Sequence, residues 1–194
     1  MYCWTRITAA VIGLLASSAA SAHVGIHSAG GLAAGFTHPF LGLDHLLAMV
    51  AVGVWAVQLG GRSVLALPAT FVSFMAVGAA LGATGTPLPH VEGMVAFSVL
   101  ALGCAVGLSA RLEGYWALPL VAAFALFHGH AHGAEMPGFA APWQYFVGIT
   151  LATALLHASG VAAASALKAR PHLVQAGGGA IGLAGVWLLV SGLA

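Results

Sequence analysis

The chain has 194 residues, of which 61% are hydrophobic and only 5% are charged, and its mean hydropathy is +1.03. A soluble domain carries about a quarter charged residues, so this composition excludes a water-soluble globule and predicts that a lipid bilayer is the solvent. The formal net charge of +1, without a basic or an acidic run, gives no indication of a nucleic-acid partner. We therefore expect an all-α integral membrane protein.

The first 22 residues have the pattern of a signal peptide. Arg6 precedes a short apolar stretch from Ile7 to Ala16, and Ala20-Ser21-Ala22 matches an A-x-A cleavage site. We expect cleavage after this site; an uncleaved first helix is the alternative. The mature chain, 23–194, would then begin with His23, with His27 close behind. Together with the free α-amine these two imidazoles are candidates to capture a metal ion, or they are ordinary polar residues of an exposed tail.

Six apolar runs follow the signal peptide. Each is long enough, at about 1.5 Å per residue, to cross roughly 30 Å of hydrocarbon. Turn-forming residues, mostly glycine and proline, separate the runs. We predict a single domain of six transmembrane helices at residues 41–59, 64–83, 92–109, 115–132, 143–167 and 173–193.

The basic residues beyond the signal peptide predict the orientation of these helices. Arg62 follows the first span, Arg111 the third, and Lys168 and Arg170 the fifth, whereas the loops after the second and fourth spans contain neither lysine nor arginine. The positive-inside rule places the three basic loops in the cytoplasm and both mature termini outside. A cleaved signal peptide predicts the same outside N-terminus.

The first polar cluster lies at the outer start of the first span and reads His38-Pro39-Phe40-Leu41-Gly42-Leu43-Asp44-His45. On an unbroken helix His38 and His45 would lie about 10 Å apart along the axis, too far to share one ion. Pro39 and Gly42 favour a break in the helix, which would fold His38 back toward Asp44 and His45.

The second polar cluster lies at the outer end of the fourth span. His128 and His132 are four residues apart, so their imidazoles lie on one face of a helix and can share a metal ion. Glu135 falls near the same stripe, whereas His130 points away from it. Glycines at positions 129 and 133 leave room for another helix, or its ligands, to approach.

Both clusters fall in the outer halves of their spans, so we expect them to form one site of imidazole and carboxylate groups. The two cysteines, Cys3 and Cys104, can form neither a disulfide framework nor a Cys-x-x-Cys site. Such ligands suit nickel, cobalt, zinc or copper(II) better than magnesium or calcium. The candidate metal ligands are His38, Asp44, His45, His128, His132 and Glu135. Secondary candidates are His23, His27, His130 and His157.

Other ionisable residues are less well placed to bind a metal ion at this site. His157 lies in the middle of the fifth span, where it is either a relay ligand further inward or the donor to a carbonyl on a neighbouring helix. His90, Glu92 and His172 lie at span ends and favour an interfacial role. A single histidine at membrane depth usually forms a hydrogen bond to a neighbouring helix. Two clusters of histidines, each with a carboxylate, instead indicate a functional site.

At these two clusters the chain resembles the HupE/UreJ family of secondary nickel permeases, which is associated with nickel-iron hydrogenases and urease. The family pattern H-P-x-x-G-x-D-H is matched from His38 to His45. The pattern F-H-G-x-A-H-G-x-E is matched from Phe127 to Glu135, with His130 at a variable position. The resemblance covers essentially the whole chain. It implies Ni²⁺ as the transported ion, uptake as the direction and the bacterial cytoplasmic (inner) membrane as the location; Co²⁺ remains open.

We expect a transporter without a permanent cofactor and without an enzymatic reaction. Asp44 and Glu135 would offset the charge of a divalent ion, and the chain has no P-loop for ATP hydrolysis. The membrane potential would then drive uptake, at about 2.3 kcal/mol per charge per 100 mV. Three alternatives remain open: an intramembrane zinc hydrolase, a haem-binding electron carrier and an exporter of the same ion.

Overall fold

The computed structural model describes residues 30–112, 114–138 and 140–192. The predicted signal peptide, its cleavage site, His23 and His27 lie outside these residues. Seven α-helices and no strand are present within them. The helices are α2 (Gly31–Leu41), α3 (Leu43–Leu59), α4 (Ser63–Ala83), α5 (Val91–Gly107), α6 (Gly114–Ala134), α7 (Pro142–Ala166) and α8 (Pro171–Ser191).

The helices confirm that the chain is a multi-pass membrane protein. Three of them, α4, α7 and α8, are long and apolar enough to cross a bilayer, and the bent pair α2 and α3 raises the number to four if it is one span. The helices α3 to α8 lie where the six spans were predicted, with ends that differ by no more than two residues. That all six of them cross the membrane stays a prediction.

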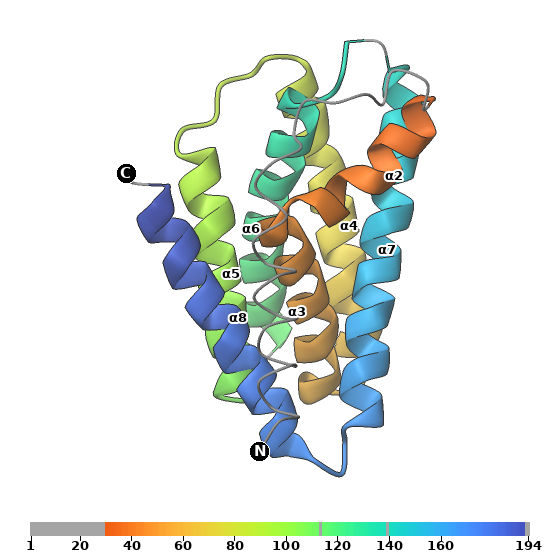
Figure 1. Cartoon of the computed structure of the whole chain (residues 1–194). Helices are drawn as coiled ribbons and strands as arrows, with labels where there is room; N and C mark the ends of the chain where they lie inside the picture. Colours follow the sequence, from red (N-terminus) through yellow and green to blue (C-terminus); the bar gives the residue numbers. More distant parts are fainter. Residues whose placement is uncertain (1–29, 113, 139, 193–194) are drawn as a thin grey trace, which may run out of the picture.

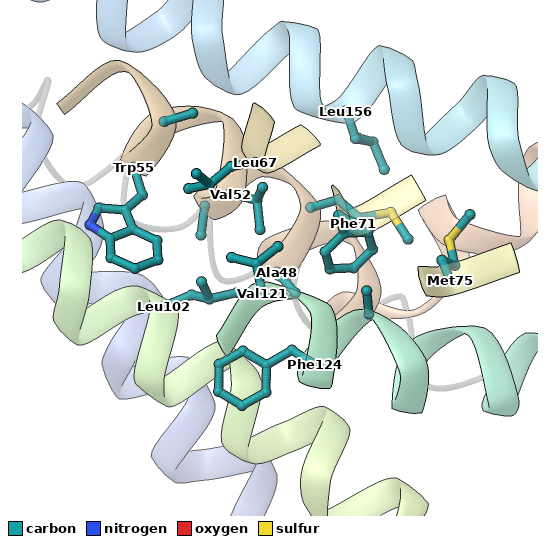
Figure 2. Close-up of a cluster of buried hydrophobic side chains, with 14 of the residues drawn as sticks. Ala48, Val52, Trp55, Leu67, Phe71, Met75, Leu102, Val121, Phe124 and Leu156 are labelled. Atoms are coloured by element: carbon teal, nitrogen blue, oxygen red, sulfur yellow. The ribbon is translucent and has the colours of Figure 1, made fainter. Parts of the chain in front are cut away.

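Helix α3 forms the centre of the bundle (Figure 1). Helix α4 packs against α6, α5 packs against α8, and both α2 and α3 pack against α7. Figure 2 shows how the core forms around Ala48, Val52 and Trp55 of α3, which meet Phe71 of α4 and Phe124 of α6. All five side chains are buried, so α3 has apolar neighbours on nearly every side.

Large apolar side chains also cover the outer surface of the bundle. Leu65 of α4 and Leu183 of α8 are 79% and 72% exposed, and Trp187 is 61% exposed. In water such an apolar surface would be unfavourable, whereas in contact with lipid it is the expected one.

A helix that the sequence analysis did not predict, α2, precedes the first span. The helix that corresponds to the first predicted span begins two residues later than residue 41: α2 ends at Leu41, and α3 begins at Leu43. The two axes are bent by 82° at Gly42, so the expected break is present there, while Pro39 lies inside α2. A Cβ atom on Gly42 would lie 2.8 Å from Oδ1 of Asp44, so a larger residue at this corner would require the Asp44 side chain to shift.

Glycines let neighbouring helices touch backbone to backbone. A Cβ atom on Gly129 or Gly133 of α6 would collide with carbonyl oxygens of α4, and one on Gly78 or Gly82 of α4 would collide with carbonyl oxygens of α6. Glycines of α5 and α8 pack in the same way. Close contact of this kind replaces the hydrophobic effect as the force that holds helices together in lipid.

The four basic residues of the described chain follow α3, α5 and α7 and so gather at one end of the bundle, which we call the basic end. Figure 1 shows the alternating directions of the helices that produce this arrangement. The junction of α2 and α3 and the end of α6 lie at the opposite end, which we call the histidine end.

Candidate metal centre

Four imidazoles from three helices meet at the histidine end of the bundle. His38 comes from α2, His45 from α3, and His128 and His132 from successive turns of α6. The ring centroid of His45 lies 4.3 Å from that of His132 and 4.8 Å from that of His128. The ring centroid of His38 lies 5.0 Å from that of His132. We call these four residues the histidine cluster. The two sequence motifs therefore meet in space as predicted.

Asp44 holds His45 in a defined orientation. Oδ1 of Asp44 lies 2.7 Å from Nδ1 of His45 and accepts a second bond from the backbone nitrogen of His45. A carboxylate only accepts, so Nδ1 carries a proton, and in the neutral imidazole Nε2 then presents a lone pair. This carboxylate–imidazole arrangement is the usual support of a metal-binding histidine.

The inner nitrogens of the cluster lack hydrogen-bond partners. Nε2 of His45, Nδ1 of His128 and both ring nitrogens of His132 are buried and have none within the described chain. His128 and His132 are both 0% exposed. Buried polar groups are nearly always paired, and each one left unpaired costs about 1–3 kcal/mol. Four such nitrogens close together are suited to binding a transition-metal ion, which accepts several nitrogen ligands.

His38 and Glu135 form the rim of the cluster. Nε2 of His38 donates to Oε2 of Glu135 at 2.9 Å, and the side chains are 28% and 48% exposed. Glu135 follows the last residue of α6, and the bond from His38 holds the pKa of its carboxyl below the usual value. Both groups are thus engaged with each other, at the point where the cluster is reached from outside the bundle.

The donors surround a common region without yet forming a coordination shell. In residues 30–112, 114–138 and 140–192 no three histidine, cysteine or acidic side chains have donors close enough to hold one ion. His38 would have to leave Glu135, and the imidazoles would have to rotate, before one ion could contact several of them. The structure thus brings all six predicted ligands into two adjoining groups, and their binding of a metal stays a prediction.

His130 and His157 lie apart from the histidine cluster. Nε2 of His130 donates to the carbonyl oxygen of Thr86 at 2.7 Å, so the ring points away from its neighbours on α6, as the helical spacing predicted. Nδ1 of His157 donates to the carbonyl oxygen of Met49 on α3 at 2.7 Å, and its buried Nε2 has no partner in the described residues. The ring of Phe71 packs against both His157 and His128.

The sequence analysis did not single out Ser98, which contacts the histidine cluster, and it gave Glu92 only an interfacial role. Ser98 of α5 contacts Nε2 of His128 at 2.8 Å, and the exposed Glu92 at the start of α5 interacts electrostatically with Asp44 and Glu135. One signal was present for Glu92, because it is one of only four acidic residues in the chain. None was present for Ser98, since a serine in an apolar helix is common.

Fold and site together define a multi-pass helical membrane protein with unpaired imidazoles and nearby carboxylates at one end. The family described as HupE / UreJ protein matches residues 10–188 of the chain. The chain is 44% identical over 189 residues to Protein HupE of Rhizobium leguminosarum bv. viciae, an alignment that covers 96% of this chain and 98% of that protein. No solved structure matches it. The chain belongs to the HupE/UreJ family.

Proposed function

We propose that this protein is a secondary transporter that carries Ni²⁺ into a bacterial cell and supplies a nickel enzyme such as a hydrogenase or a urease. The observation that carries the proposal is the set of buried, unpaired imidazole nitrogens in the histidine cluster. Imidazole is a favoured ligand of nickel, cobalt, zinc and copper, whereas magnesium and calcium prefer oxygen. Membership of the HupE/UreJ family supports nickel among these metals, with cobalt as the closest competitor.

The proposed topology has six membrane spans, formed by α3 to α8 in the cytoplasmic membrane, with the histidine end outside. Arg62, Arg111, Lys168 and Arg170 all follow helices that end at the basic end, which supports a cytoplasmic position for that end. The mature chain, 23–194, would then begin outside, after removal of the signal peptide. In that position His38 and Glu135 face the outer side of the membrane, from which the ion arrives.

A hydrated ion first meets the rim. Glu135 is half exposed and ionised, so it attracts a dication, and displacement of its bond to His38 frees an imidazole as a ligand. His45 and His132 are then close enough to replace further water molecules, since their rings lie 4.3 Å apart. Asp44, beside His45, offsets charge that would otherwise be very costly in a low dielectric.

Further inward the next free donor is Nε2 of His157. The Phe71 ring contacts His128 on one side and His157 on the other, with ring centroids 5.6 Å and 5.0 Å away. We propose that His157 receives the ion after it leaves the cluster. A single imidazole binds more weakly than several, which favours release toward the cytoplasm.

The driving force would be the membrane potential. Moving one charge through 100 mV releases about 2.3 kcal/mol, and hence roughly twice that for a divalent ion. The chain carries no nucleotide-binding P-loop, and we propose ion transport rather than catalysis as its activity.

Accumulation of radioactive nickel in a bacterium that lacks its own nickel transporters tests the proposal. Cells that express the wild-type chain should accumulate nickel, and cells that express Asp44→Asn should accumulate roughly 10–100-fold less, as for other supports of metal ligands. Asparagine keeps the shape of the side chain and removes its charge. Absence of accumulation by the wild type, with the protein present in the membrane, would contradict nickel uptake.

A further inference from the structure

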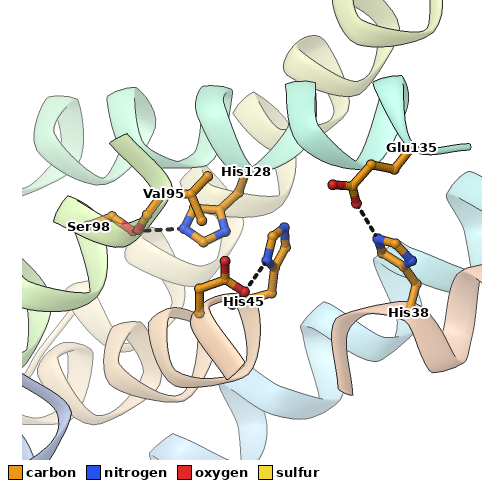
Figure 3. A network of polar contacts seen from close by, with 7 residues as sticks. His38, His45, Val95, Ser98, His128 and Glu135 are labelled. Atoms are coloured by element: carbon orange, nitrogen blue, oxygen red, sulfur yellow. Dashed lines mark hydrogen bonds and ion pairs between the residues drawn. The ribbon is translucent and has the colours of Figure 1, made fainter. Parts of the chain in front are cut away.

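Ser98 links the backbone of α5 to His128 of α6. Its hydroxyl oxygen lies 2.6 Å from the carbonyl oxygen of Val95 and 2.8 Å from Nε2 of His128, and its side chain is 0% exposed. Figure 3 shows the serine between its own helix and the imidazole. Ser98 belongs to neither histidine motif and lies on a helix that contributes no residue to the histidine cluster.

The two contacts share a single hydroxyl proton, and the carbonyl determines where it lies. A carbonyl oxygen only accepts, and two oxygens 2.6 Å apart would repel each other without a proton between them. Ser98 therefore donates to Val95. The serine oxygen then offers His128 only lone pairs, so Nε2 of His128 must carry a proton and donate it to Ser98.

This bond decides which nitrogen of His128 is free to bind an ion. A neutral imidazole has one N–H, so protonation of Nε2 leaves the lone pair on Nδ1. Nδ1 is buried and lacks a hydrogen-bond partner within the described residues, and its ring lies 4.8 Å from the ring of His45. The free nitrogen of His128 thus belongs to the same group of unpaired donors as Nε2 of His45.

We infer that Ser98 is a positioning residue, which fixes the tautomer and the ring orientation of His128 so that Nδ1 binds the transported ion. Its role parallels that of Asp44 toward His45, with a hydroxyl in place of the carboxylate. Loss of such a support typically weakens metal binding 10–100-fold. The identity of the ion rests on the proposed function, whereas the tautomer does not.

Nitrogen NMR on the full-length protein in lipid bilayers, with isotope-labelled histidine, tests the tautomer directly. The signals of His128 are assigned by their loss in His128→Gln. We expect the wild type to show neutral His128 with its proton on Nε2, and Ser98→Ala to shift the population toward the Nδ1–H form. A proton on Nδ1 in the wild type would overturn the inference, whether or not the protein transports nickel.

Calorimetric titration of the purified protein with NiCl₂ tests the consequence. We expect Ser98→Ala to bind nickel 10–100-fold more weakly and Ser98→Thr, which keeps the hydroxyl, to bind within about threefold of the wild type. Ser73→Ala is the matched control, because among the described residues the Ser73 hydroxyl bonds only to the Ala69 carbonyl of its own helix, at 2.8 Å.

The outcomes separate this inference from the proposed function. Wild-type affinity in Ser98→Ala, together with weakened binding in His128→Gln, would overturn the role of Ser98 and leave nickel transport standing. Loss of binding in both Ser98→Ala and Ser98→Thr would also contradict it, because the hydroxyl would then not be the feature that matters. Absence of nickel binding by the wild type would refute the proposed function, and the tautomer measured by NMR would still decide the inference.

Discussion

One oxygen of Asp44 accepts two hydrogen bonds from its sequence neighbour His45, from the backbone nitrogen at 2.8 Å and from Nδ1 at 2.7 Å. The pair is fixed by the start of α3, where the backbone nitrogens are free to bond a side chain. In this geometry Asp44 would act on a bound ion through His45 and through its negative charge, rather than as a freely turning ligand. The corner between α2 and α3 therefore determines how the histidine cluster is built.

Gly42→Ala should damage the metal site while leaving the bundle folded. The new Cβ atom would lie 2.8 Å from Oδ1 of Asp44 and 3.2 Å from Nδ1 of His45, so the pair must shift. We expect nickel affinity, measured by calorimetry, to fall about tenfold or more, as when other supports of metal ligands are disturbed. Gly93→Ala is the control, because a Cβ atom there meets nothing within 4 Å. Equal affinity in the two variants would show that the corner does not position the ligands.

Glu92→Gln should weaken the capture of the ion. Glu92 is exposed and interacts with Asp44 and Glu135, so its charge adds to the negative potential at the mouth of the cluster. We expect the nickel concentration for half-maximal uptake into vesicles to rise severalfold, with the maximal rate unchanged and the difference reduced at high salt. Arg62→Gln, which removes a charge of the opposite sign at the basic end, should leave the half-saturation concentration unchanged. A lower maximal rate with unchanged half-saturation would assign Glu92 to a later step or to folding.

His157→Phe should slow transport without weakening binding. The substitution removes the inner nitrogen donor, while the cluster that captures the ion keeps its ligands. We expect the equilibrium affinity for nickel to stay within about threefold of the wild type and the rate of uptake to fall about tenfold, a difference of about 1.4 kcal/mol in the barrier. His172→Gln, an exposed histidine at the start of α8, should change neither quantity. Weaker binding in His157→Phe would place this residue in the capture site itself.

The sequence predicted the helices well because each apolar run is long and turn residues separate the runs. It missed α2, whose 11 residues include the polar Thr37 and His38 and a proline, so that no apolar run stands out. The sequence predicted a break near Gly42 but not its angle of 82°. Glycine permits many backbone angles, and the packing of α2 and α3 against α7 selects one of them.

The candidate site was predicted where it depends on local spacing and missed where it depends on packing. The four-residue spacing of His128 and His132 places them on one face of any helix. The contact between Ser98 and His128 spans 30 residues, and that between His38 and Glu135 spans 97 residues. Such pairs depend on which helices become neighbours, and a single sequence does not contain that information.

Nickel flux into lipid vesicles that contain only the purified protein tests the central claim most directly, with the wild type compared with His132→Ala under an imposed inside-negative potential. His132 is the cluster residue with both ring nitrogens buried and unpaired in the described chain, so its loss removes a ligand and breaks no hydrogen bond that the structure shows. We predict potential-dependent nickel entry with the wild type and at least about tenfold slower entry with His132→Ala. Equal flux through the two proteins, or no flux above that of empty vesicles with the wild type, would contradict transport through the histidine cluster.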